Sequence, residues 1–272
     1  MTYIGQYRKH AFNVTELDYL YTLELLLNSK TRKDARNGMT RSLPFETLEF
    51  NIERQLPILT TRKIYYPGVL GEYAAFIRGP KHINDFKKFG CNFWDQWADD
   101  AGNINVDYGN TWINFNGINQ MQNALDTLRT NPYDRRILIN GWNPANIDKL
   151  SLPCCHYSYQ FWSDGKVLDL LWNQRSADWM IGMPSDMIVA SVMLLCFSNL
   201  ANLKPRNVKM VIGDAHIYEE HVEAAKLLLT KECFEFPTYT LKPQKDLYSF
   251  IPSDLKIINY THHDPIKLQL KE

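Results

Sequence analysis

The apolar positions along this chain follow two different periods, which together predict a mixture of helices and strands. Residues 13–29 (NVTELDYLYTLELLLNS) carry apolar side chains at helical spacing and begin with an Asn13-x-x-Glu16 pattern that is close to a capping box. Residues 187–203 (MIVASVMLLCFSNLANL) form the longest apolar tract, and the serines and asparagines within it favour a buried core helix over a membrane span. The sequence therefore predicts two long helices, the second of which follows a turn, GMPSD, at residues 182–186.

Strands are predicted where apolar residues alternate or run together with β-branched and aromatic residues. These segments are residues 44–52 (PFETLEFNI), 135–144 (RRILINGWNP), 156–174 (HYSYQFWSDGKVLDLLWNQ) and 205–218 (PRNVKMVIGDAHIY). Ser163-Asp164-Gly165-Lys166 is a strong hairpin-turn signal, and the two strands that it joins must be antiparallel. The pattern therefore favours an α+β fold with one large sheet over a doubly wound parallel fold.

Composition narrows the class of partner. A chain of 272 residues with 45% hydrophobic content can bury one sizeable core, so a single domain over residues 1–272 is expected. Thirty basic and thirty acidic residues cancel, so no net field favours nucleic acid or a membrane, and a small-molecule partner is expected. Five irregularly spaced cysteines, and no charged-then-apolar leader in MTYIGQYRKH, indicate a reduced, cytoplasmic protein, and no metal site is expected.

Cys155 and His156 are the first candidates for chemistry. A thiol adds to an electron-poor carbon only as the thiolate, which forms at neutral pH only where nearby cations or backbone donors lower its pKa. Free cysteines are among the most buried residues, so a structural role is the commoner interpretation of an isolated Cys-His pair.

Arginines near strand ends and one strand with polar residues supply further candidates for ligand binding. Arg135 and Arg136 precede one predicted strand and Arg175 follows another, where guanidinium groups form either a solvated rim or a phosphate grip. Asp214, His216 and Tyr218 share one strand face at period two, which suits either recognition of a sugar or a hydrogen-bonded strand edge.

Six blocks of this sequence resemble the thymidylate synthases and their pyrimidine-modifying relatives. The blocks are LPILTTRK, FWDQWADDAGNINVDYGNTW, YDRRILINGWNP, LPCCHYSYQF, NQRSADWMIGMPSD and LKPRNVKMVIGDAHIYEEH, and they occur in the family's order and approximate spacing. The match runs from about Arg36 to about Lys267. It implies an α+β fold with a large mixed sheet flanked by helices, a homodimer formed through the sheet face, and 5,10-methylenetetrahydrofolate as co-substrate.

The resemblance assigns roles to matching residues. Cys155 would add to C6 of a pyrimidine nucleotide, and it is preferred over Cys154 because it directly precedes His156, as in the family's PCH motif. Glu72 would order water and shuttle protons, and Tyr108 would be the catalytic tyrosine, with His156 beside them. The other implied ligands are Arg175, Ser176 and the loop residue Arg36 for phosphate, Arg135 and Arg136 for phosphate from the other subunit, Gln174 near the nucleotide, His216 and Tyr218 for the sugar 3′-hydroxyl, and Trp94, Trp97, Asp178 and Gly182 for the folate.

Asp186 stands where thymidylate synthases carry an asparagine, in a turn that reads like GLPFN. The amide suits uracil because it offers a donor and an acceptor, whereas a carboxylate accepts from the N3–H and amino groups of a cytosine edge. The same exchange is a hallmark of the family's deoxycytidylate hydroxymethylases. The alternative is that Asp186 only caps the helix that follows.

The choice of product depends on whether water reaches the site. Ser185 replaces a bulky family residue, Ala74 and Ala75 shrink another wall, and the tail DPIKLQLKE differs from the family's apolar terminus, so a loosened closure and a 5-hydroxymethyl product from dCMP are expected. The alternatives are C5-methylation of dCMP, a thymidylate synthase acting on dUMP, and a catalytically silent nucleotide- or RNA-binding relative. Modified cytosine nucleotides in this family are typical of bacteriophages, which implies DNA modification in a host cytoplasm if the source is viral.

Overall fold

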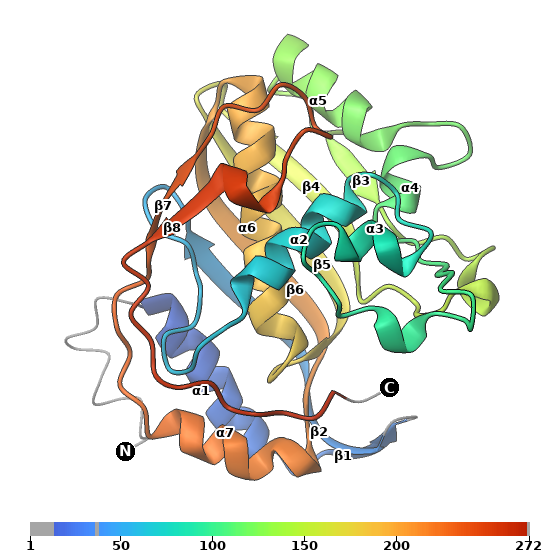
Figure 1. Ribbon diagram of the computed structural model, residues 1–272. Helices are drawn as coiled ribbons and strands as arrows, with labels where there is room; N and C mark the ends of the chain where they lie inside the picture. Colours follow the sequence, from blue (N-terminus) through green and yellow to red (C-terminus); the bar gives the residue numbers. More distant parts are fainter. Residues whose placement is uncertain (1–13, 36–37, 271–272) are drawn as a thin grey trace.

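The computed structural model describes residues 14–35 and 38–270, which build a six-stranded mixed sheet with helices packed against it (Figure 1). Its strands are β1 (Arg32–Ala35), β2 (Gly38–Asn51), β3 (Leu138–Asn140), β4 (His156–Ser163), β5 (Val167–Asp178) and β6 (Lys204–Tyr218). The order across the sheet is β1-β2-β6-β5-β4-β3. Only the β5–β6 pair is parallel among these strands. The predicted α+β fold with a large mixed sheet flanked by helices is confirmed.

Helices and a small second sheet complete the described part of the chain. The helices are α1 (Val14–Asn28), α2 (Tyr66–Phe76), α3 (Ile83–Lys87), α4 (Asn110–Ile113), α5 (Gln120–Thr130), α6 (Gly182–Ala201) and α7 (Val222–Leu229). Short 3-10 turns lie at η2 (Asp95–Trp97), η3 (Ile147–Lys149), η4 (Glu219–His221) and η5 (Pro252–Asp254), and β7 (Thr238–Leu241) pairs with β8 (Leu255–Ile258). The hairpin at residues 163–166 joins β4 to β5 as predicted, with Gly165 at a φ of 84°.

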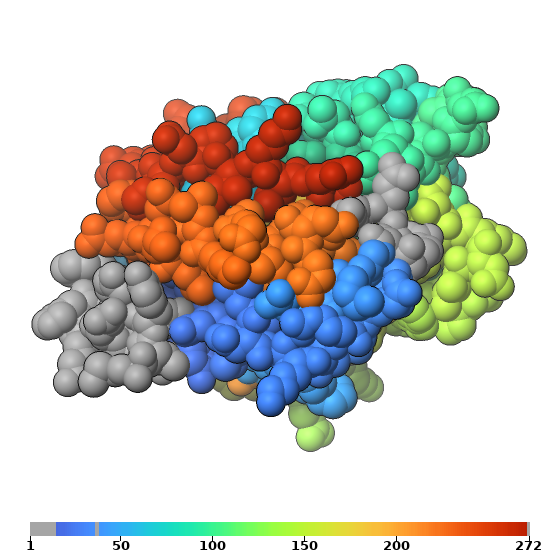
Figure 2. All heavy atoms as spheres, turned by 90° about the horizontal axis from the view of Figure 1, so that it is seen from below, coloured from blue at the N-terminus to red at the C-terminus, as the bar shows by residue number. Residues whose placement is uncertain are grey.

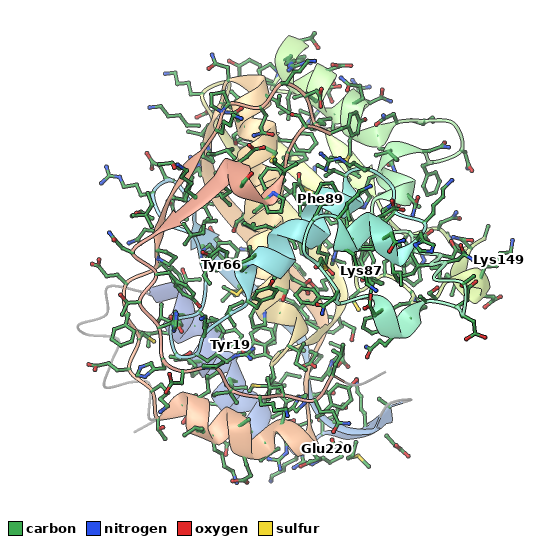
Figure 3. All side chains as sticks on the ribbon, viewed as in Figure 1. Tyr19, Tyr66, Lys87, Phe89, Lys149 and Glu220 are labelled. Carbon is green, nitrogen blue, oxygen red and sulfur yellow. The ribbon has the colours of Figure 1, made fainter. Side chains whose placement is uncertain are left out.

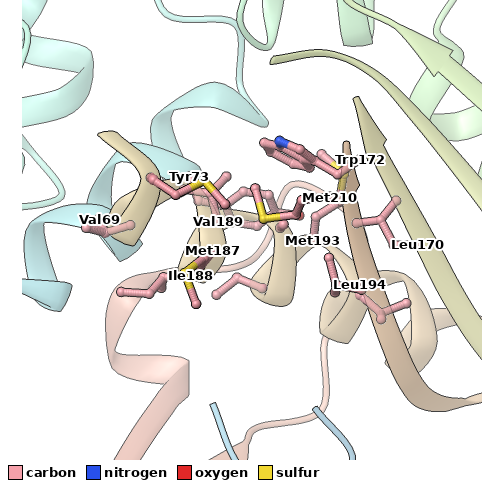
Figure 4. Close-up of a cluster of buried hydrophobic side chains, with 14 of the residues drawn as sticks. Val69, Tyr73, Leu170, Trp172, Met187, Ile188, Val189, Met193, Leu194 and Met210 are labelled. Carbon is pink, nitrogen blue, oxygen red and sulfur yellow. The ribbon is translucent and has the colours of Figure 1, made fainter. Parts of the chain in front are cut away.

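Helix α6 fills the centre of the core. Figure 4 shows Met187 and Met193 of α6 beside Tyr73 of α2 and Trp172 of β5, and all four side chains are buried. The helix is long and apolar enough to cross a membrane, but 83% of its most apolar window is buried inside the protein. Its apolar surface is therefore covered by other parts of the same chain, as the sequence predicted for a core helix.

The start of α6 differs from the sequence prediction. The helix begins at Gly182, so GMPSD is not a turn but the first turns of the helix, and Asp186 lies inside it. Pro184 fits there because a first-turn residue has no intrahelical use for a backbone N–H. The backbone N–H groups of Met180 and Ile181 donate to Asp178 Oδ1 at 2.8 and 3.2 Å. The helix-capping interpretation of Asp186 is therefore wrong.

Buried polar contacts tie α1 to the loop that carries the LTTRK block. Glu16 is fully buried, and its carboxylate accepts hydrogen bonds from the backbone N–H and the hydroxyl of both Thr60 and Thr61, at 2.7–2.8 Å. Tyr19, labelled in Figure 3, stacks on Trp179 with ring centroids 5.5 Å apart. Asn13, the other half of the expected capping box, lies outside the described residues.

The C-terminal segment runs back along the protein as an extended strap. Tyr260 donates to the carbonyl of Leu59 at 2.7 Å, and His221 Nε2 lies 2.9 Å from the carbonyl of Gln269. Figure 2 shows this red segment along the surface beside the orange segment that contains α7. The strap therefore brings the end of the chain next to loops from its first third.

Gly109 should be indispensable for the fold. Its φ is +76°, and a Cβ there would lie 1.8 Å from the carbonyl oxygen of Phe76. We expect Gly109→Ala to add an overpacking cost of about 1–3 kcal/mol to the roughly 1–2 kcal/mol of a left-handed non-glycine residue. Gly90→Ala is the matched control, because Gly90 has a φ of +79° and nothing within 4 Å of its Cβ position. Urea unfolding of both variants measures the difference, and equal losses would contradict the clash.

Candidate active site

One cavity of about 1020 Å³ collects most of the predicted site residues. It lies beside α2, the start of α6 and the ends of β5 and β6. The predicted residues that line it are Glu72, Trp94, Trp97, Tyr108, Cys155, His156, Gln174, Arg175, Ser176, Asp178, Gly182, Asp186, His216 and Tyr218. Residues spread over the chain from α2 to β6 thus line one cavity. Its volume gives the site enough room for two small molecules.

Two of the predicted arginines, Arg135 and Arg136, do not line this cavity. Arg36 lies outside the described residues. Arg135 and Arg136 are exposed ahead of β3 at the edge of the sheet, and Arg136 forms a two-point ion pair with Asp134 at 3.0 and 2.8 Å. Their guanidinium groups are therefore not part of the cavity of their own chain.

Cys155 is the cysteine that faces the cavity. Its backbone N–H donates to the Tyr108 hydroxyl, and Arg175 Nε donates to the carbonyl of Cys154 at 2.8 Å, which fixes the loop before β4. Burial raises the pKa of the Cys155 thiol, and the nearby Arg175 guanidinium opposes that rise. Cys154 is buried outside the cavity, with Sγ 3.5 Å from the carbonyl of Gly141 and a pKa raised by burial to about 12. Of the two thiols, only Cys155 is placed to meet a ligand.

Asp186 reaches the cavity floor from the second turn of α6. Its Oδ2 accepts a hydrogen bond from Gln174 Nε2 at 2.6 Å, and 16% of its side-chain surface is exposed, toward the cavity. Burial raises the pKa of Asp186 to about 7, against the lowering effect of the Gln174 bond, and Asp178 adds a further rise. In a large fraction of the molecules at neutral pH, the Asp186 carboxyl group is therefore protonated and neutral.

Glu72 holds a second carboxyl group in this cavity. Trp94 Nε1 donates to Glu72 Oε1 at 2.8 Å, and burial raises the pKa of Glu72 to about 8. Trp94 and Trp97 lie with ring centroids 5.4 Å apart, and the Trp97 indole N–H is buried without a hydrogen-bond partner among the described residues. This wall combines flat apolar faces with a protonated carboxyl group and one unused donor.

His156 lines the same cavity as Cys155, Glu72 and Asp186. It is buried at 4% exposure, and burial lowers its pKa to about 3, so the imidazole is neutral at neutral pH. Its ring centroid is 4.4 Å from that of Tyr108 and 4.4 Å from that of Trp172. The Nε2 atom lies 4.0 Å from Asp186 Oδ1.

The ends of β5 and β6 form another wall of the cavity. Asp214, His216 and Tyr218 all line the cavity, as their period-two spacing predicted. His216 Nδ1 lies 3.4 Å from Asp214 Oδ1 and 3.5 Å from the Ser176 hydroxyl, and Lys33 pairs with Asp214. This wall offers hydroxyl, imidazole and charged groups to a polar ligand.

Several wall residues were not assigned from the sequence. Lys33, Arg62 and Lys63 add cations to the cavity. The last two belong to the LTTRK block, whose match to the family could have pointed to them. Ile266, Leu268 and Leu270 of the C-terminal strap also line the cavity, and their alternation in PIKLQL was the available signal.

Two of the three arguments for a loosened closure do not agree with the structure. Ala74 and Ala75 face the core at 0% and 1% exposure and do not line the cavity, because α2 turns Glu72 and Phe76 toward it instead. The tail supplies three aliphatic side chains to the cavity rather than leaving it open. Ser185 does line the cavity.

The described residues contain no group of three His, Cys, Asp or Glu side chains that could hold a metal ion. The residues around the cavity do fit a reduced folate. Trp94 and Trp97 offer flat aromatic surface to such a ligand. Asp178 lines the cavity just before the N-terminus of α6.

The sequence profile of the family described as "Thymidylate synthase" matches residues 17–272. Members of this family carry out folate-dependent one-carbon transfer to C5 of a pyrimidine nucleotide. Since the match extends over nearly the whole chain and includes every residue of the cavity, the protein belongs to the thymidylate synthase family.

Proposed function

We propose that the protein transfers the one-carbon unit of 5,10-methylenetetrahydrofolate to C5 of dCMP and releases a 5-hydroxymethyl nucleotide. The observation that supports cytosine is the carboxyl group of Asp186 on the cavity floor, beside Cys155 and held by Gln174. As a neutral acid, Asp186 donates to N3 of cytosine with one oxygen and accepts from the 4-amino group with the other. The discrimination arises when the proton passes to N3. The resulting carboxylate accepts from N3–H and from the 4-amino group of cytosine, whereas it would meet only lone pairs at O4 of uracil.

The covalent step uses groups from three elements. The Cys155 thiolate, which Arg175 favours, forms a bond to C6 of the base. The C5=C6 electron pair moves to form C4=C5, and N3 takes the proton of Asp186 as the C4=N3 pair shifts onto it. Asp186 is then a carboxylate that accepts from both N–H groups of the base. When bound, methylenetetrahydrofolate supplies the one-carbon unit that the nucleophilic C5 receives.

Ser185 favours water as the group that completes the reaction. It lines the cavity next to Asp186 with a small hydroxyl side chain, which suits an ordered water. A second candidate is C5-methylation of dCMP, which the aliphatic strap residues favour because they exclude water from the cavity. Both candidates share the steps through Cys155 and Asp186.

The phosphate site is proposed to need two subunits. Arg175 and Ser176 would bind the phosphate from one chain, and Arg135 and Arg136 would reach it from the other. Tyr133, Leu138 and Trp162 lie on or near β3 and β4 and are 68%, 44% and 54% exposed, which is apolar surface that a second copy would cover.

Replacing Asp186 should exchange the preferred base. Asp186→Asn restores a donor and an acceptor for uracil, so we expect the ratio of dCMP to dUMP reactivity to fall by about 10–100-fold, the equivalent of one or two mismatched polar contacts. Tritium release from [5-³H]dCMP and [5-³H]dUMP measures the ratio. Asp126→Asn is the matched control, because it makes the same exchange on the exposed surface of α5, outside the cavity, and should leave the ratio unchanged. Release from dUMP alone by the unaltered enzyme would identify a thymidylate synthase, and release from neither nucleotide would indicate a silent binding protein.

The product should carry oxygen. Mass spectrometry of dCMP after incubation with methylenetetrahydrofolate is expected to show a hydroxymethyl group. In water enriched in ¹⁸O the new group should gain the heavy isotope, since its oxygen comes from solvent. A methyl group would refute hydroxymethylation and support the second candidate.

Complementation should test the shared phosphate site. Cys155→Ser and the double variant Arg135→Ala/Arg136→Ala are each expected to be inactive. If the arginines cross the interface, heterodimers of the two regain one intact site, and random mixing yields roughly a quarter of the unaltered activity. A mixture that stays inactive, although subunit exchange is shown with differently tagged chains, would contradict the shared site.

A further inference from the structure

The Tyr159 hydroxyl makes two contacts with the same residue, His156. Its oxygen lies 2.6 Å from His156 Nδ1 and donates to the carbonyl oxygen of His156 at 3.0 Å. A phenol has one proton, and a carbonyl oxygen can only accept. Both contacts are therefore hydrogen bonds at the same time only if Nδ1 carries the imidazole proton and donates it to the Tyr159 oxygen.

This arrangement leaves the other ring nitrogen of His156 without a proton. The imidazole is neutral, so a proton on Nδ1 makes Nε2 an acceptor. Nε2 is the atom that lies 4.0 Å from Asp186 Oδ1. Tyr108 and Trp172 pack against the ring with centroids 4.4 Å away and keep it in this orientation.

The hydrogen-bonding group that faces the other carboxyl oxygen of Asp186, Oδ2, is fixed as a donor. The indole N–H of Trp172 can only donate, and it bonds Gln174 Oε1 at 3.1 Å. The Gln174 amide nitrogen therefore faces Asp186 Oδ2 at 2.6 Å and the carbonyl of Ser176 at 3.0 Å. Asp186 thus meets a donor at Oδ2 and an acceptor in the direction of Oδ1.

We propose that Tyr159 is a positioning residue that locks His156 in its Nδ1–H tautomer. The lone pair of bare Nε2 then faces Asp186 Oδ1 at 4.0 Å, beyond hydrogen-bonding distance, and disfavours a negative charge there, so that Asp186 keeps the acid form that cytosine needs. The consequence for cytosine rests on the proposed function, whereas the tautomer lock does not. The opposite tautomer would turn an N–H toward Asp186 and stabilise its carboxylate. That form cannot supply the proton that N3 takes when the thiolate adds to C6.

Other ionisable groups face Asp186 from each neighbouring element. Glu72 comes from α2, Cys155 from the loop before β4, Tyr108 from the loop before α4, and Asp178 and Arg175 from β5. The two carboxyl groups favour a neutral Asp186 and Arg175 opposes it. His156 can present either an acceptor or a donor to Asp186 without a change in net charge, and its Nδ1 is the atom that contacts Tyr159.

Nitrogen-15 NMR of the full-length enzyme, labelled at histidine, tests the tautomer directly. Comparison with His156→Gln assigns the His156 signals, and we expect the proton on Nδ1 in the unaltered enzyme. In Tyr159→Phe, which retains the ring but removes the acceptor, the signals should shift toward the Nε2–H form. A proton on Nε2 in the unaltered enzyme would overturn the proposal, and this measurement decides even if Tyr159→Phe does not fold.

The pH profile of tritium release from dCMP gives a second readout. Because dCMP needs the protonated form of Asp186, kcat/KM should fall as the pH rises through about 7. In Tyr159→Phe the carboxylate form of Asp186 should be stabilised. The fall of kcat/KM should then occur about one pH unit lower, and the ratio of dCMP to dUMP reactivity should drop about tenfold. Tyr239→Phe is the matched control, because its hydroxyl donates to the Ile52 carbonyl at 2.6 Å outside the cavity. A limb that stays in place in Tyr159→Phe would overturn the proposal.

The two proposals fail in different ways. If the unaltered enzyme releases label only from dUMP while NMR shows Nδ1–H, the cytosine assignment is wrong and the tautomer lock stands. If dCMP is the substrate but NMR shows Nε2–H, the lock is wrong and the proposed function stands.

Discussion

A carboxyl group enclosed at the bottom of a cavity must be paired with donors or remain neutral, because burial penalises the charge. Asp186 has one strong donor, Gln174, and its remaining neighbours are an imidazole without charge and two further acids, Glu72 and Asp178. The surroundings therefore favour the acid form. That preference leaves Asp186 with a proton, and a base whose N3 takes up this proton leaves behind a carboxylate that can accept two N–H bonds.

The sheet explains why the other groups converge around this acid. β5 and β6 run parallel, so Ser176 pairs with Asp214 and Asp178 with His216 in register. The Cys155 loop precedes β4, the antiparallel neighbour of β5, and Arg175 holds it through the carbonyls of Pro153 and Cys154. The Cys155 thiol, the wall with Asp214 and His216, and the acid Asp186 thus lie on or beside adjacent strands and on the helix that follows them.

Differences between the predicted and observed structures have identifiable causes. GMPSD was expected to be a turn ahead of the helix, yet a proline in the first turn of a helix costs no hydrogen bond, and α6 includes the whole segment. Ala74 and Ala75 were expected at a cavity wall, but the helical period turns them into the core and turns Glu72 and Phe76 outward. The tail was expected to leave the cavity open because it differs from the family's apolar terminus, but its alternating Ile266, Leu268 and Leu270 all line the cavity.

The sequence alone determined the α+β class, the main strands and two long helices through periodicity, and many residues of the cavity through the order of its motifs, because these are local properties of the chain. It did not point to the cations of the cavity, Lys33, Arg62 and Lys63, or to its aliphatic strap. It also determined that an acid stands where an amide serves uracil. The protonation of that acid was decided only by the tertiary structure. Asp186 is buried only in the folded protein, where Trp172 orients the Gln174 amide toward it and Tyr159 contacts His156. No local pattern reveals these contacts, because only the fold brings the groups together.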